Sequence, residues 1–224
     1  MTIALGNYSH AQGNQTTASG NYSHSEGNQT NAIGIGAHVE GALAIALGNY
    51  SHAEGNQTTA SGIASHSQGF LTTASGSYSH VEGYKTSSSS TASHAEGDST
   101  KAIGKGSHAE GYKTIANGQY SHAGGNETVA NGNYQTAIGK FNTADTTSAF
   151  IIGNGTSALR SNAFSMDWNG NTKHYGHIHL TGATNSSTAN KTQIIFEESG
   201  AEHIALSSNN NALVLNPTST TTTN

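Results

Sequence analysis

The sequence predicts an all-β fold in which the chain winds into a stack of nearly identical parallel coils. Two observations lead to this prediction. A seven-residue unit repeats twenty times without interruption between Ala4 and Thr143. Nine histidines recur within it at a constant spacing of fourteen residues, namely His10, His24, His38, His52, His66, His80, His94, His108 and His122. A repeat this regular indicates a solenoid, in which each coil contacts only its neighbours.

The unit reads small-x-Gly-x-x-[Ser/Thr]-x, as in Ala-Ser-Gly-Asn-Tyr-Ser-His at 18–24. Its first position is always Ala, Ser or Val, and its third position is Gly in nineteen of the twenty units, with Ser90 as the exception. A seven-residue period is also typical of coiled coils, but those need bulky apolar residues at two positions of each heptad. A glycine in every unit would also cost a helix about 1 kcal/mol each time. The repeat therefore predicts strands.

Alternation along each strand predicts which residues face inward. In Ser-His-Ser-Glu-Gly at 23–27, the two serines and the glycine share one face, and His24 and Glu26 share the other. We expect the small face to line a coil too narrow for side chains larger than Val. Gly27 lets the backbone turn, and the pair at 28–29 forms a corner. Ten coils of two half-turns, with strands about 4.7–4.9 Å apart, give a stack roughly 45–50 Å tall.

A coil lined by Ala, Ser, Thr and Gly offers little apolar surface to bury. Burial contributes only about 25 cal/mol per Å² of apolar surface, so one such stack is too weakly stabilised by its own core. We therefore expect an obligate oligomer, a parallel homotrimer, whose outward faces pack against other copies.

The residues of several units resemble a known family. Ala-Ile-Gly or Ala-Leu-Gly occurs at 32–34, 46–48, 102–104 and 137–139. These segments are similar to the A-I-G-x-x-S repeats of YadA-like adhesin heads. Ser-His-Ala-Glu-Gly, at 51–55, 93–97 and 107–111, is similar to repeats of bacteriophage tail-fibre proteins. The resemblance covers about two-thirds of the chain and implies a trimeric left-handed parallel β-roll head over residues 1–145.

The outward positions differ between the two halves of each coil. One half carries the histidine and, two residues later, usually a glutamate: Glu26, Glu40, Glu54, Glu82, Glu96 and Glu110. The other half is mixed and includes apolar pairs such as Ile45 and Leu47. Because an interface between copies tolerates less drift than a solvent-exposed surface, we expect the His–Glu face to form the trimer interface. The apolar residues of the other face argue in the opposite direction.

The histidine column has several other interpretations. A Ser-His-Glu catalytic relay is excluded, because adjacent Ser and His point to opposite faces of a strand. A solvent-exposed ladder, a metal ladder and a pH switch are alternatives to the interface, since imidazole binds metals and titrates near neutral pH.

After Thr143 the composition changes, and residues 146–175 are expected to form a neck with a capping hairpin. The apolar run at 150–153 and the alternation from Phe164 to Trp168 predict strands, with Trp168 in the core of the neck. Asn169-Gly170 predicts a hairpin turn. The segment from 154 to 171 also resembles the one that follows such repeats in phage tail proteins.

Residues 176–224 are expected to form a β-stalk with short strands at 193–196, 203–206 and 212–215 and a frayed Thr-rich tail. Within it, His177 and His179 share one strand face, so a parallel trimer would offer six imidazoles to iron or another transition metal. The Gly-x-His-x-His pattern resembles motifs that hold iron on the axis of phage tail-fibre tips, although this chain has a single copy. An exposed histidine pair on a fibre surface is the alternative.

Composition excludes several classes of partner. The chain of 224 residues has no Cys, so neither disulfides nor thiolate chemistry is available. A net charge of −5 with eight basic residues argues against nucleic acid. No apolar stretch is long enough for a membrane span, and no secretion signal precedes the first repeat.

Taken together, these features predict a non-enzymatic phage tail-fibre or receptor-binding component in the virion tail. Its partners would be itself, a bacterial surface glycan or protein, and other tail or fibre proteins. A bacterial trimeric autotransporter adhesin head and an architectural spacer are the alternatives. A depolymerising tailspike would need a carboxylate pair in a groove, which the glutamate column does not suggest. The corner aromatics Phe70, Tyr84 and Tyr112 are candidate ligand contacts, since aromatic faces suit sugars and proteins.

Overall fold

The computed structural model describes residues 1–176, and all regular structure in this part of the chain is β. Each coil of the left-handed β-roll contributes one long strand, one short strand and two corners. The short strands are β1 (Ile3–Ala4), β3 (Thr17–Ala18), β5 (Asn31–Ala32), β7 (Ile45–Ala46), β9 (Thr59–Ala60), β11 (Thr73–Ala74), β13 (Ser87–Ser88), β15 (Lys101–Ala102), β17 (Ile115–Ala116) and β19 (Val129–Ala130). They form a parallel sheet of ten strands.

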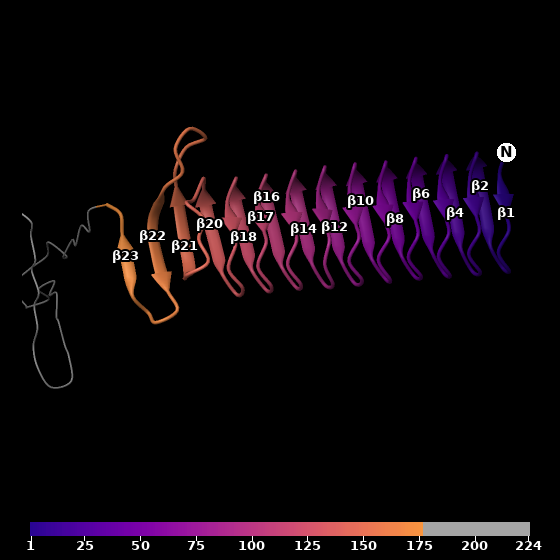
Figure 1. The fold of residues 1–224 in the computed structure, drawn as a ribbon. Coiled ribbons are helices and arrows are strands. Elements are labelled where there is room, and N and C mark those ends of the chain that lie inside the picture. The colour runs from indigo at the N-terminus through magenta and orange to yellow at the C-terminus, as the bar shows by residue number, and fades with distance from the viewer. Residues whose placement is uncertain (177–224) are drawn as a thin grey trace, which may run out of the picture. The chain divides into compact units, whose positions relative to one another are not determined.

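The long strands follow one another along the roll in a regular row (Figure 1). They are β2 (His10–Asn14), β4 (His24–Asn28), β6 (His38–Ala42), β8 (His52–Asn56), β10 (His66–Phe70), β12 (His80–Tyr84), β14 (His94–Asp98), β16 (His108–Tyr112), β18 (His122–Asn126), β20 (Thr136–Lys140) and β21 (Ser148–Asn154). Paired residues of neighbouring long strands are fourteen positions apart in the sequence, so like residues form columns. The predicted all-β roll is confirmed.

The core of the roll is as narrow as the repeat predicted. The first position of each unit is fully buried from Ala18 to Ala137, and the buried Ser or Thr of the sixth position lies beside it. Val39 and Val81 are the largest residues in the first-position column and are also fully buried.

Two kinds of glycine column explain the one exception in the third position. Gly27 and the glycines in register with it from Gly13 to Gly139 have φ values between 94° and 118°, which L side chains rarely adopt. A side chain at Gly27 would also meet the backbone of Gly41 in the next coil. Ser90 belongs to the other column, where φ is not positive, so serine adopts that backbone conformation without strain, although a side chain at its neighbour Gly76 would meet the backbone of the next coil just as one at Gly27 would.

The parallel ladder is one coil longer than predicted, because β21 pairs in parallel with β20. Ile151 continues the alanine column and is fully buried, and Gly153 is in register with Gly139. The sequence therefore keeps its fourteen-residue register after the seven-residue unit has ended. Eleven parallel long strands result, where ten coils were expected.

The end of the roll holds larger buried side chains than the interior does. Gln135 and Asn142 replace the usual Ser or Thr and are fully buried. The Gln135 amide donates to the carbonyls of Asp145 and Ser148, and its oxygen accepts from the N–H groups of Asn131 and Gly132. The size limit set by Val therefore does not hold in the last coils, where these amides fill the space with satisfied hydrogen bonds.

Two antiparallel strands complete the long sheet, β22 (Asn162–Asp167) and β23 (Thr172–His174). Asn169 and Gly170 lie in the turn between them, and Gly170 has a φ of 85°. The Asp167 carboxylate accepts from the N–H groups of Asn169 and Asn171, so the turn begins directly after Asp167. The prediction of a buried Trp168 is wrong: this side chain is in the turn and 54% exposed.

Candidate functional site

The nine histidines form one column on the outer face of the long strands. Their imidazole rings stack, with centroids of neighbouring rings 4.7–5.1 Å apart. From His24 onward the residues are half-buried, because each ring covers its neighbours. The spacing of the column follows from the fourteen-residue repeat, since one coil advances the chain by one strand separation.

A second column runs beside the histidines, two residues further along each strand. It holds the six glutamates together with Gln12, Gln68 and Gly124. We call the two columns together the His–Glu ladder. Its shortest ion-pair contacts join a histidine to the glutamate of the preceding coil. His122 Nε2 lies 3.2 Å from Glu110 Oε1, and His108 Nε2 lies 3.7 Å from Glu96 Oε1.

Crowding within the ladder changes its titration. Burial lowers the pKa of His52, His66 and His94, and neighbouring histidines lower it further, while nearby glutamates oppose the shift. Burial raises the pKa of Glu96, and the adjacent Glu82 carboxyl acts in the same direction. The imidazoles of His52, His66 and His94 are therefore mainly neutral at pH 7.

The serines that precede the histidines do not form a catalytic relay with them. Ser23, Ser51 and Ser121 are buried inside the roll, and each hydroxyl donates to the carbonyl of the glycine three residues earlier, at 2.6–2.8 Å. The histidine rings lie on the other side of the strand. The hydroxyl groups of these adjacent serines therefore do not face the imidazole rings, as the alternation along the strand predicted.

Among residues 1–176, two groups of three ladder residues bring potential metal-binding atoms together. They are His52, Glu54 and His66, and Glu96, His108 and Glu110, with the three atoms of each group within 4.8 Å of one another. The other predicted metal pair, His177 and His179, lies outside the described residues. The placement of the ladder at a trimer interface stays a prediction.

The three predicted corner aromatics lie in one column at the ends of β10, β12 and β16. Phe70, Tyr84 and Tyr112 are about two-fifths exposed, at 38%, 43% and 41%. Phe70 stacks on Tyr84 with centroids 5.5 Å apart. The ammonium of Lys113 lies 4.9 Å from the centre of the Tyr112 ring. These contacts hold the rings at the surface, and their role in ligand binding stays a prediction.

The opposite corner carries a more exposed aromatic column that the sequence analysis missed. It consists of Tyr8, Tyr22, Tyr50, Tyr78, Tyr120 and Tyr134. All six have φ between 54° and 60°, and their exposed fractions range from 47% to 84%. The sequence feature that indicates this column is the tyrosine that stands two residues before many of the ladder histidines. A left-handed corner position was not expected for tyrosine, because that conformation normally favours Gly or Asn.

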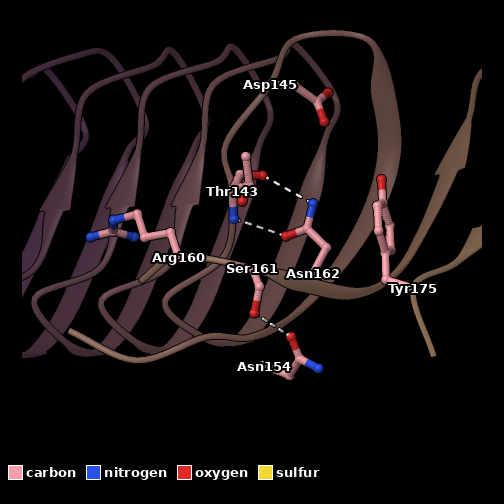
Figure 2. Close-up of a pocket in the computed structure, with 7 residues that line it drawn as sticks. All are labelled: Thr143, Asp145, Asn154, Arg160, Ser161, Asn162 and Tyr175. Carbon is pink, nitrogen blue, oxygen red and sulfur yellow. Dashed lines mark hydrogen bonds between the residues drawn. The ribbon is translucent and has the colours of Figure 1, made fainter. Parts of the chain in front are cut away.

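A pocket of about 350 Å³ lies where the roll meets the hairpin (Figure 2). It is lined by Thr143, Asp145, Asn154, Arg160, Ser161, Asn162 and Tyr175. Asn162 exchanges two hydrogen bonds with the backbone of Thr143, and Ser161 donates to Asn154 (Figure 2). Asp145 is the only carboxylate of the lining. Burial opposes its ionisation, yet hydrogen bonds from Ser148 and Thr147 hold its pKa below the ordinary value.

The lining of this pocket does not provide an acid–base pair. Arg160 is held by the Glu127 and Asn142 carbonyls and lies 3.6 Å from the Glu127 carboxylate. Most polar groups of the pocket therefore stabilise the last coil and the following loop. A glycosidase-type mechanism needs two carboxyl groups across the cleft, and the lining supplies one.

The narrow roll, its parallel columns and its small buried face define the class of protein: a repetitive parallel β-roll. Comparison with known families identifies the particular repeat. The model of the YadA head domain repeat matches residues 1–23, 26–51, 40–65, 95–121 and 109–134. Residues 1–134 therefore carry YadA-like head domain repeats. No curated protein matches the chain.

Across residues 1–176 the structure contains no helix that is long and apolar enough to cross a membrane.

Proposed function

We propose that the chain is a non-enzymatic, trimeric attachment fibre, and specifically a phage tail-fibre or receptor-binding component that binds a bacterial surface glycan or protein. The observation that supports this proposal is the difference between the inward residues and the corner residues of each coil. The inward residues are small and uniform, and hydroxyls such as that of Ser23 donate to backbone carbonyls within the roll, whereas the corner residues vary and include exposed aromatic rings. Such a scaffold holds a surface in place and encloses no reaction.

Trimerisation is supported by the small apolar content of the core. The buried residues of the roll are almost all Ala, Ser and Thr, which contribute little stabilisation by burial. Packing of outward faces against other copies would supply the remainder. We place the His–Glu ladder at the interface between copies. Light scattering of the double variant Glu82→Lys/Glu96→Lys should then show monomers. The control variant Lys101→Glu, changed on the short-strand sheet, should keep the mass of a trimer.

A second candidate is the head of a bacterial trimeric autotransporter adhesin. The match to YadA head domain repeats favours it, because that family consists of adhesins. Both candidates place the fibre outside the cell, on a virion tail or on a bacterial surface. An architectural spacer, which would hold a separate binding protein at a distance, is the third.

One binding experiment distinguishes the three. The labelled full-length chain is tested against a panel of bacterial strains and against immobilised animal matrix proteins. Selective binding to a few strains, lost when their surface glycans are stripped, supports the phage component. Binding to matrix proteins alone supports the adhesin head, and binding to neither supports the spacer.

A further inference from the structure

The histidine column leaves most of its inner nitrogen atoms without hydrogen-bond partners. Nε2 of six histidines is buried at the atomic level and unpartnered: His24, His52, His66, His80, His94 and His108. A buried nitrogen without a partner loses the hydrogen bonds that water would provide. These atoms are directed toward the glutamate column, as the contacts of His108 and His122 with Glu96 and Glu110 show.

The glutamate column concentrates negative charge beside these nitrogens. Glu82, Glu96 and Glu110 are in register at successive strands, so their carboxylates lie in one row and repel one another. A cation between the columns would relieve the repulsion and would also satisfy the nitrogens. Lysine and arginine do not supply that charge, because the ladder contains neither residue.

Two levels of the ladder have the donor set that a divalent transition metal prefers. His52, Glu54 and His66 supply two imidazole nitrogens and one carboxylate. Two histidines and a glutamate, with a fourth position open to water, form a known zinc ligand set. Glu96, His108 and Glu110 supply one imidazole and two carboxylates. We propose that these two groups each bind one zinc-type divalent ion, so that the ladder carries two metal sites per chain.

The sequence explains why His66 and Glu54 form a group. The coil of His66 carries Gln68 where other coils carry glutamate, so Glu54 of the preceding coil is the carboxylate available between His52 and His66. Zinc bonds to these atoms are about 2.0–2.2 Å long. The ligand atoms must therefore approach one another from their present separations within 4.8 Å. Rotation of the half-exposed side chains provides this movement, because their strands are fixed and their outer atoms are not packed in the core.

Each group is complete within one chain. The sites therefore do not depend on whether the ladder faces solvent or a second copy, and the inference does not rest on the proposed attachment function.

The test is a calorimetric titration of the metal-free, full-length chain with zinc chloride at pH 7.5. The chain carries His177→Ala and His179→Ala so that only ladder sites are counted. Two equivalents of zinc per chain are expected, falling to one in Glu54→Gln, to one in Glu110→Gln and to none in the double variant. Glu26→Gln is the matched control and should still bind two, because Glu26 belongs to neither group of three donors.

Glutamine is a conservative replacement at these positions, since Gln12 and Gln68 already occupy the same column. Circular dichroism of each metal-free variant checks that the roll is folded, and a zinc-dependent rise in Tm provides a second readout. Absence of zinc binding would overturn the proposal, as would equal stoichiometry in wild type and the double variant. Equally tight calcium binding would also overturn it, because it would indicate a non-selective acidic surface rather than nitrogen ligation.

Discussion

Nε2 of His122 lies 3.2 Å from Oε1 of Glu110, which belongs to the preceding coil of the roll. The coil of His122 has Gly124 in place of a glutamate, so its histidine uses the carboxylate of its neighbour. Side-chain contacts in this fold thus join successive coils as well as residues of the same strand. A substitution in one coil should consequently change the side-chain contacts of the next coil.

The stability of the roll should fall as the pH is lowered from 7.5 to 5.5. Burial and neighbouring histidines place the pKa of folded His52, His66 and His94 below the ordinary value of about 6.5. The unfolded chain therefore binds more protons over this range, and acid favours unfolding. The raised pKa of Glu96 acts in the opposite direction at lower pH, near the usual range of a carboxyl group.

Differential scanning calorimetry at the two pH values measures this effect. A variant with His52→Gln, His66→Gln and His94→Gln should show a smaller difference in Tm between pH 7.5 and 5.5. An unchanged Tm of the wild type over this interval would contradict the assignment of lowered pKa values to the ladder.

Gly27→Ala should destabilise the chain by about 3 kcal/mol or more, because a strained backbone conformation alone costs of order 1–3 kcal/mol. Gly27 has a φ of 118°, and a methyl group there would press against the backbone of Gly41. Urea unfolding followed by circular dichroism provides the measurement. Ser90→Gly is the control at the other glycine column and should change the free energy of unfolding by less than about 1 kcal/mol. A Gly27→Ala variant as stable as Ser90→Gly would contradict backbone strain at Gly27.

The sequence predicted the roll well because its structure is local and repetitive. The inward placement of Ala18, Ser25 and Val39 follows from strand alternation alone, and the constant spacing sets the register of both sheets. The ladder of histidines could be predicted for the same reason. Its detailed pairing could not, because whether His108 contacts Glu96 of the preceding coil or Glu110 of its own coil depends on side-chain rotations.

The misses occur where the repeat changes. Trp168 was expected in a core because it alternates with Ser165 and Asp167. The Asp167 carboxylate, however, accepts hydrogen bonds that start the turn directly after Asp167, so Trp168 lies in the turn and is exposed. The parallel pairing of β21 with the roll was missed because the unit loses its serine and alanine pattern while Gly153 preserves the register. Both outcomes depend on long-range pairing or local capping, which strand alternation does not report.

Ala95→Val should be tolerated, whereas Ala95→Leu should destabilise the roll by about 1–3 kcal/mol, the usual cost of overpacking a core. Ala95 is fully buried and directly opposite Val81 in the neighbouring strand. Val39 and Val81 show that the column accepts a branched side chain of that size. Chemical unfolding of both variants measures the difference. A Leu variant as stable as wild type would mean that the coil is wider than its lining indicates.

Gln135→Leu should cost about 3 kcal/mol, since each buried polar group left unpaired costs about 1–3 kcal/mol and some of them can rearrange. The Gln135 side chain is fully buried and makes hydrogen bonds of 2.7–3.1 Å to four backbone groups at the end of the roll. Leucine has a similar volume and no polar atoms, so the loss would report the hydrogen bonds rather than a cavity. Gln119→Leu is the matched control at an exposed corner, where the expected change stays within about 0.5 kcal/mol. Hydrogen exchange should locate the effect at the Asn131 and Gly132 amides, which lose their acceptor. If those amides keep their protection in Gln135→Leu, the amide of Gln135 does not close the end of the roll.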